Sequence, residues 1–283
     1  MLGDKQNQSV SEGANAMQAG RDINYHGLSV SEVKELCALF LRDNFPQLRE
    51  EAKRTAEEHV RVFAQRLEGR LVQDAASIVL DKFREPDVQA AVNDAVKASA
   101  RKGEKANPQI LCTLISERVA KTSNDFKDMV MSEAIEVCAR LTSQQIGLIS
   151  ILHAVKSIAL KGIPGVEILE GFATGVYESS VGGWGLSQSQ KQYLQYMGVA
   201  SINQFAGGSV FEYKSKEYDF LKLGGEAEFK SVIKLRAPTY FRLLESFDSE
   251  NLIQIELTSV GQAIAIANLS RRLGSIDYSI WLK

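Results

Sequence analysis

A run of apolar residues at steps of three and four positions, between residues 48 and 71, constrains this chain most strongly. The positions between them carry mainly Glu, Lys and Arg, so the segment has one narrow apolar seam and a charged remainder. This spacing is the period of an α-helix. The seam fits packing within the chain and contact between chains equally well. Its members are Leu48, Ala52, Ala56, Val60, Phe63, Leu67 and Leu71.

Helix-start signals occur on both sides of this segment. Ser29 and Glu32 have the spacing of a capping box, in which each side chain bonds the backbone N–H of the other residue. Pro86 and Pro108 stand where prolines of a first helical turn are tolerated. Residues 28–161 are therefore predicted to form an α-helical bundle. Its further expected helices lie at about residues 72–84, 86–101, 108–121, 124–141 and 144–161.

The most apolar stretch and the cysteines indicate buried helices. Ser150, His153 and Lys156 interrupt the stretch at 146–163, so we expect a core helix and no membrane partner. The 3 cysteines are not clustered as a disulfide framework or a zinc site requires, so we expect buried thiols, no metal and no cofactor. The opening 1–27 is polar and lacks the apolar core of a signal peptide, which favours a cytoplasmic location.

A leader over residues 1–27 carries regularly spaced glycines at Gly13, Gly20 and Gly27. Such spacing is a repeat signal. Its Gly, Asn and Ser content disfavours a helix, whereas short strands that turn at each glycine are allowed. One copy has too little apolar surface to fold alone, so we predict that copies from several chains pair. A disordered tail is the alternative. The predicted interface residues are Val10, Met17, Ile23 and Tyr25.

Glycines become frequent after Gly162, and the pattern then becomes mixed. We expect a Gly-rich helix and junction at 162–185 and a small α+β domain at 186–283, whose order of elements is similar to a winged helix. The predicted fold class is thus mainly α, with a helical bundle, a winged-helix-like C-terminal domain and a short β leader. In the C-terminal domain, strands are expected at 210–213, 231–235, 253–257 and 276–282, and helices at 187–197, from Pro238, and from 258 to Arg272.

Several segments resemble a family of uncharacterised bacterial proteins. They are QAGRDIN at 18–24, GLSVSEV at 27–33, DNFPQL at 43–48, EEAKRTAEEHVRVF at 50–63, LTSVGQAIAIANLSRRLG at 257–274 and IDYSIWLK at 276–283. The helix that begins with LTSVG is also similar to abortive-infection proteins of the alpha type, which implies a role in phage defence. Neither resemblance supplies catalytic residues.

Two spacings point to chemistry on nucleic acids. Arg54 and His59 match the Arg-x4-His spacing of HEPN-type ribonucleases, in which the histidine acts in acid/base chemistry and the arginine holds phosphate. The alternative is a solvated, charged helix face. Asp219, Glu228 and Lys230 resemble the core of metal-dependent nucleases, where two carboxylates bind Mg²⁺. A charged hairpin or loop is the alternative to that site.

Arg271 and Arg272 would contact DNA if the C-terminal domain were a winged helix. Recognition of DNA normally needs a wider basic face, and a formal net charge of -2 provides no global field toward nucleic acid. We therefore favour a non-enzymatic, homo-oligomeric sensor, adaptor or scaffold in bacterial anti-phage defence. Its partners would be itself and a phage or host protein. A ribonuclease effector and a DNA-binding regulator are the alternatives.

Overall fold

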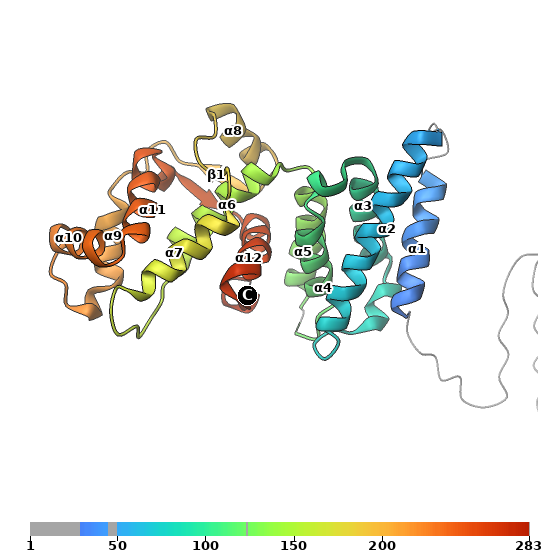
Figure 1. Cartoon of the computed structure of the whole chain (residues 1–283), viewed down its shortest axis with the longest axis horizontal. Helices are drawn as coiled ribbons and strands as arrows, with labels where there is room; N and C mark the ends of the chain where they lie inside the picture. Colours follow the sequence, from blue (N-terminus) through green and yellow to red (C-terminus); the bar gives the residue numbers. More distant parts are fainter. Residues whose placement is uncertain (1–28, 45–49, 123, 283) are drawn as a thin grey trace, which may run out of the picture.

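The computed structural model describes residues 29–44, 50–122 and 124–282, and helices form nearly all of their regular structure (Figure 1). The mainly helical class predicted from the sequence is confirmed. The α-helices are α1 (Val30–Asn44), α2 (Glu50–Gln73), α3 (Pro86–Lys102), α4 (Pro108–Arg118), α5 (Asp125–Cys138), α6 (Ser143–Ser157), α7 (Ile168–Ser179), α8 (Gln188–Tyr196), α9 (Val210–Glu217), α10 (Glu226–Arg236), α11 (Pro238–Ser249) and α12 (Ser259–Leu273).

Two strands and several short 3₁₀ helices complete the described fold. The strands β1 (Ala200–Ile202) and β2 (Ile255–Leu257) pair antiparallel, with Ser201 opposite Glu256. The 3₁₀ helices are η1 (Leu80–Arg84), η2 (Gly103–Ala106), η3 (Asp219–Leu221), η4 (Leu252–Gln254) and η5 (Tyr278–Ile280).

The apolar seam of α2 is buried inside the chain from Ala56 to Leu71, while Ala52 is exposed and Leu48 lies outside the described residues. Helices α1, α3 and α4 pack around α2, and with α5 they form what we call the N-terminal bundle (Figure 1). The seam therefore serves packing within the chain, one of the two uses that the sequence allowed. Its buried members are Ala56, Val60, Phe63, Leu67 and Leu71.

The predicted helix starts are explained by a capping box at α1 and by first-turn prolines at α3 and α4. Glu32 N–H donates to Ser29 Oγ at 3.2 Å, and Ser29 N–H donates to Glu32 Oε2 at 2.5 Å, which completes the predicted capping box. Pro86 and Pro108 occupy first-turn positions of α3 and α4. A proline is tolerated there because its missing N–H would have no partner within the helix.

Helices α6 and α12 lie at the centre of the molecule. Every residue of α6 from Gln145 to Val155 is buried, as expected of a core helix. Helix α12 packs most extensively against α6, and also contacts α7 on one side and α4 and α5 on the other. The C-terminal part, α6–α12, is thus joined to the N-terminal bundle through α12, as Figure 1 shows.

Three predicted strands and one predicted helix are wrong. Residues 210–213 and 231–235 lie in α9 and α10, where Phe229 and Ile233 are buried four residues apart, a helical repeat that outweighs the short apolar run. Residues 276–282 contain η5 instead of a strand, since Tyr278 is buried while Ile280 is 56% exposed. The helix expected at 72–84 is absent because α2 continues to Gln73, and turns then lead to η1.

The expected strand at 253–257 is confirmed over Ile255–Leu257 as β2. Within the described residues, no helix combines the length and the apolar character that crossing a bilayer requires. The predicted interface residues Val10, Met17, Ile23 and Tyr25 lie outside the described residues.

Candidate functional site

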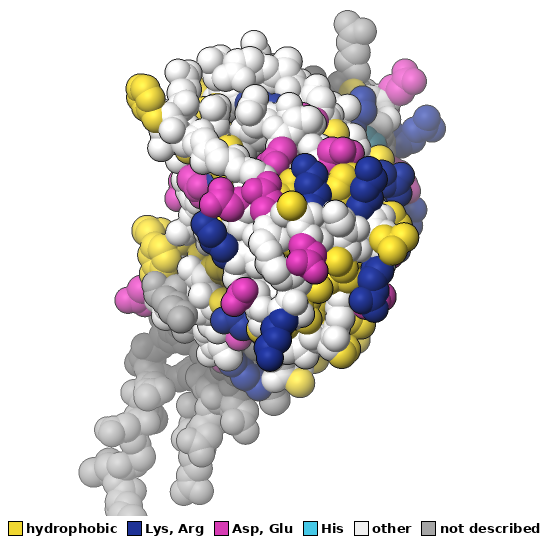
Figure 2. Space-filling view, turned by 90° about the vertical axis from the view of Figure 1, so that its left-hand side faces the viewer, with side chains coloured by type: hydrophobic (Ala, Val, Ile, Leu, Met, Phe, Trp, Pro, Cys, Tyr) yellow, Lys and Arg dark blue, Asp and Glu magenta, His cyan; other side chains and the backbone are white. Residues whose placement is uncertain are grey.

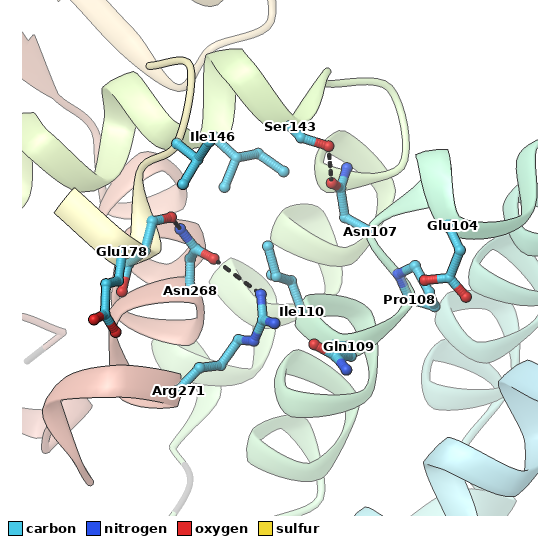
Figure 3. A pocket seen from close by; sticks show the side chains of 12 residues that line it. Glu104, Asn107, Pro108, Gln109, Ile110, Ser143, Ile146, Glu178, Asn268 and Arg271 are labelled. Atoms are coloured by element: carbon cyan, nitrogen blue, oxygen red, sulfur yellow. Dashed lines mark hydrogen bonds between the residues drawn. The ribbon is translucent and has the colours of Figure 1, made fainter. Parts of the chain in front are cut away.

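A pocket of about 290 Å³ lies where the N-terminal bundle meets the C-terminal part (Figure 3). Residues of η2 and the start of α4 form its bundle side, while α6, α7 and α12 form the other side. A molecule bound there would touch both parts of the fold. The lining residues are Glu104, Asn107, Pro108, Gln109, Ile110, Ser143, Ile146, Glu178, Ser179, Val181, Asn268 and Arg271.

Asn268 and Arg271 form the centre of the pocket wall on α12. Asn268 is 4% exposed, and its Nδ2 donates to Ser150 Oγ at 2.9 Å and to the backbone oxygen of Ser179 at 2.7 Å. These bonds leave Asn268 Oδ1 facing Arg271, whose Nη1 lies 3.5 Å away. Figure 3 shows the Arg271 side chain reaching from α12 to a position beside Asn268 and Ile110. A buried amide therefore helps to hold the guanidinium in the pocket.

Both glutamates of the pocket are engaged by arginines outside its lining. Arg66 binds Glu104 through two N–H···O contacts, at 2.6 and 2.9 Å, and this hydrogen bonding lowers the pKa of Glu104. Arg272 lies 3.5 Å from Glu178. Among the described residues, no carboxylate pairs with Arg271. Burial, followed by the positive charges of Arg272 and Arg66, lowers the pKa of Arg271.

The rest of the lining, from the starts of α4 and α6, combines a polar corner with an apolar surface. Asn107 adopts the left-handed backbone conformation, at φ 57°, that asparagine tolerates better than most residues. Its Nδ2 donates to the backbone oxygen of Leu141 at 3.2 Å, and its Oδ1 accepts from Ser143 Oγ at 3.0 Å. This pair ties the start of α4 to the start of α6. Ile110 and Ile146 supply the apolar surface.

The structure places Arg54 and His59 along one open groove on α2, with a volume of about 550 Å³. His59 is half-buried, and its Nδ1 lies 3.2 Å from the backbone oxygen of Ala100. The imidazole packs against Gly103, where an added Cβ would come within 2.8 Å of Nε2. Two acidic residues, Glu57 and Glu58, also line the groove. Both predicted ribonuclease residues thus share a surface, and the histidine ring is held in a defined orientation.

The residues of the predicted nuclease core lie on helices instead of a hairpin. Asp219 is in η3, while Glu228 and Lys230 are in α10, with the Lys230 ammonium 4.4 Å from the ring centre of Phe211. The described residues contain no group of three or more His, Cys, Asp or Glu side chains placed to hold a metal ion. The alternative of a charged hairpin or loop is wrong for Glu228 and Lys230, because residues 226–236 form α10.

The predicted pair Arg271 and Arg272 is divided between two environments. Arg271 lines the pocket, while Arg272 contacts Glu178. Asn107, Ser143 and Asn268 were not predicted as site residues from the sequence. One signal was available for Asn268, since an asparagine inside the apolar run AIAIANL is expected to need buried hydrogen-bond partners.

The fold is mainly helical, and a pocket with polar lining residues lies between its two packed parts. A family model matches residues 27–226 and 222–282, and the chain belongs to that uncharacterised family. This match is consistent with the expected membership of an uncharacterised family, while the motif QAGRDIN at 18–24 lies outside the matched residues. No curated protein and no solved structure matches the chain.

Proposed function

We propose that this protein is a self-assembling sensor that binds a small molecule between its N-terminal bundle and its C-terminal part. The observation that carries the proposal is the shared pocket, whose walls come from α4 on one side and α6, α7 and α12 on the other. A ligand that contacts two packed parts can favour one of their arrangements over another, in proportion to its difference in affinity. Such coupling is what a sensor or adaptor requires.

The proposed biological setting is cytoplasmic anti-phage defence, with the chain itself and a phage or host protein as partners. Two sequence features support this setting. The glycine-spaced leader at 1–27 would assemble copies of the chain, and the helix from Leu257 is similar to abortive-infection proteins. In this scheme the leader joins protomers, and occupancy of the pocket controls what the assembly presents to its partner.

The pocket is tested with the full chain and the dialysable fraction of a bacterial extract. We expect this fraction to raise the melting temperature of the wild-type protein, because a ligand that binds only the folded state stabilises it. Ser143→Trp, which fills the pocket from the first turn of α6, should abolish the rise. Ser189→Trp is the matched control in the first turn of α8, at an exposed serine outside the pocket lining. The absence of stabilisation in wild type, or equal stabilisation of both variants, would refute the proposal.

Assembly is tested separately by light scattering. Deleting residues 1–27 should reduce the particle mass to that of a single chain, while Ser143→Trp should leave the mass unchanged in the absence of ligand. An unchanged mass after the deletion would show that the leader does not join protomers.

A ribonuclease effector is a second candidate, favoured by the geometry of His59. The Ala100 carbonyl accepts from Nδ1–H in the tautomer that leaves Nε2 available to act as a base, and Arg54 lines the same groove. We expect any RNA cleavage by the purified protein to be lost in His59→Ala and retained in Thr55→Ala, a control in the same groove. Equal cleavage by both variants would remove this candidate.

A winged-helix-like DNA-binding regulator is the third candidate, and its supporting observation is the absence of a carboxylate partner for Arg271 among the described residues. On the face in Figure 2, however, acidic and basic side chains are interspersed. This mixture gives that face no single-sign field for phosphates. The expected result for a regulator is salt-sensitive duplex binding that is lost when Arg271→Ala and Arg272→Ala are combined.

A further inference from the structure

Arg271 is a cation in a pocket that also contains two glutamates, yet neither glutamate neutralises it. Glu104 is bound by Arg66 through two contacts, and Glu178 is paired with Arg272. Counting each pair as neutral leaves one positive charge in the pocket, that of Arg271. Arg271 is exposed to solvent on the open side of the pocket lining, and an arginine keeps its charge there. The pocket therefore offers a place for one negative charge.

The surroundings of Arg271 strengthen this preference. Burial and, after it, the charges of Arg272 and Arg66 lower the pKa of Arg271, although each of these two arginines is also paired with a glutamate. Helices α4 and α6 both begin at the pocket, with Pro108 and Ser143 in its lining, so their N-terminal partial charges are also positive. These helix N-termini would favour an anion next to Arg271.

The orientation of the guanidinium is set in advance by Asn268. Its Nδ2 is fixed by Ser150 Oγ and the Ser179 carbonyl, so its acceptor Oδ1 is turned toward Arg271 Nη1. This contact engages one edge of a group that has five N–H donors. The remaining donors suit an oxyanion, because a guanidinium can bind a carboxylate or a phosphate through two parallel hydrogen bonds. Asn268 is in this sense a positioning residue.

The pocket lining also offers a small apolar surface from two largely buried isoleucines, Ile110 (4% exposed) and Ile146 (1% exposed). Ile110 and Ile146 line the space, and Ile110 stands beside the Arg271 side chain in Figure 3. A volume of about 290 Å³ is at the lower end of ligand pockets, so it suits a molecule with one or two rings. We propose that the pocket binds a small molecule that places one oxyanion, a carboxylate or a phosphate, on Arg271 and an apolar body against Ile110 and Ile146.

This inference rests on the proposed function and is tested by calorimetry on the full chain with three probes. Phenyl phosphate and benzoate carry the two oxyanions on the same ring, and benzamide is their neutral counterpart. We expect at least one oxyanion to bind at least about tenfold more tightly than benzamide, because a charge-assisted pair is worth more than a neutral hydrogen bond. Which of the two binds better identifies the group. Equal binding of all three probes, or none, would overturn the inference.

Variants then test whether Arg271 is the residue that binds the oxyanion. Arg271→Gln should weaken binding of the preferred oxyanion at least about tenfold, while Arg61→Gln, an exposed arginine of α2, should leave it unchanged. Gln109 lines the pocket and is exposed, so its charge can be varied without disturbing the core. Gln109→Glu should weaken oxyanion binding, and Gln109→Lys should strengthen it. Unchanged affinity in Arg271→Gln would overturn the assignment.

Failure of this inference is distinguishable from failure of the proposed function. Suppose that the extract stabilises Arg271→Gln to the same extent as wild type but does not stabilise Ser143→Trp. The pocket then binds a ligand, and the inferred contact between an oxyanion and Arg271 is wrong. If the extract stabilises no form of the protein, the proposed function itself falls. A duplex DNA that binds more tightly than phenyl phosphate, in an Arg271-dependent and salt-sensitive manner, would assign Arg271 to nucleic acid and overturn the small-molecule inference.

Discussion

His153 meets Trp281 edge to face, with ring centres 4.8 Å apart and an angle of 66° between the planes. His153 is fully buried in α6, and neither of its ring nitrogens has a hydrogen-bond partner among the described residues. Trp281 belongs to the segment after α12, and its neighbour Leu282 is 1% exposed. The last residues of the described chain thus cover a core histidine that has no means of stabilising a proton.

This burial makes the stability of the fold depend on pH. Burial lowers the pKa of His153 from 6.5 to about 4, so the unfolded chain binds a proton more readily than the folded one. The full stability is present above pH 6.5 and is lost progressively as the pH falls toward 4. The free energy of unfolding should drop by about 2 kcal/mol between pH 7 and pH 5 from this residue alone. Urea unfolding at pH 7 and at pH 5, monitored by tryptophan fluorescence, measures this change in the free energy of unfolding.

The variant His153→Leu provides the control for that measurement. It removes the titrating group while keeping an apolar side chain of similar size, so the difference between pH 7 and pH 5 should shrink by about 2 kcal/mol relative to wild type. His59 is half-buried and stays in both proteins. An identical pH dependence in wild type and variant would show that His153 is not the source.

Gly183 is predicted to tolerate no side chain. A Cβ there would lie 2.5 Å from the backbone carbon of Gly147 and 2.7 Å from the backbone nitrogen of Leu148, and neither atom belongs to a flexible side chain. The segment after α7 could not then approach α6 as closely as it does. Gly183→Ala should lower the free energy of unfolding by about 2 kcal/mol.

A side chain at Gly171, in α7, is expected to stabilise the fold, in contrast to one at Gly183. Gly171 lies in α7 with nothing within 4 Å of an added Cβ, and it is exposed. Gly171→Ala should raise the free energy of unfolding by about 0.5–1 kcal/mol, because alanine is the better helix former. Denaturant titrations of Gly183→Ala and Gly171→Ala give the two changes in the free energy of unfolding. Similar effects of the two substitutions would mean that the close approach at Gly183 is not limiting.

The starts of helices in the N-terminal bundle can be predicted from the local sequence, because the residues that set each start lie close to it in the chain. Ser29 with Glu32, and Pro86 and Pro108, lie within one turn of the helix that each begins. The strands at 210–213 and 231–235 were mispredicted because short apolar runs do not distinguish helix from strand. For 231–235, the helix is favoured by the joint burial of Phe229 and Ile233, and this burial depends on tertiary packing.

The pocket could not be predicted from the sequence, since its walls come from distant parts of the chain. Asn107 and Asn268 line the same space although 161 positions separate their numbers. Nothing in the local pattern around Arg271 shows that Glu104 is already bound by Arg66 and Glu178 by Arg272. The unneutralised charge is a property of the packing of α2, η2, α7 and α12, so only the structure reveals it.

Arg118 is predicted to stabilise the bundle through a group of carboxylates. Its side chain is 5% exposed, and its guanidinium lies 3.1 Å from Glu85, 2.9 Å from Asp87 and 3.2 Å from Asp128. Burial lowers the pKa of Arg118, but the carboxylates outweigh burial and the pKa is raised. Because Glu85 and Asp87 remain partly in solvent, Arg118→Met should cost about 2 kcal/mol of unfolding free energy, less than a fully buried pair.

The matched comparison is Arg140→Met, which removes an arginine from a pair with Glu136 on the surface of the same bundle. Both side chains there are at least half exposed, so the change should stay within about 0.5 kcal/mol. Denaturant unfolding of the two variants under one buffer condition gives the comparison. A cost for Arg118→Met no larger than that for Arg140→Met would show that the buried group of carboxylates does not contribute.

The cysteines are predicted to be chemically silent until the protein unfolds. Cys37, Cys112 and Cys138 are buried and free, as the sequence indicates. Burial raises the pKa of each thiol to about 12, so at pH 8 the reactive thiolate fraction is lowered by about a thousandfold relative to an exposed cysteine. Iodoacetamide should leave the native protein unlabelled while labelling all three residues in guanidinium. Peptide mass spectrometry would identify any thiol that reacts in the native state at the rate of free cysteine, and its presence would contradict the burial of that helix.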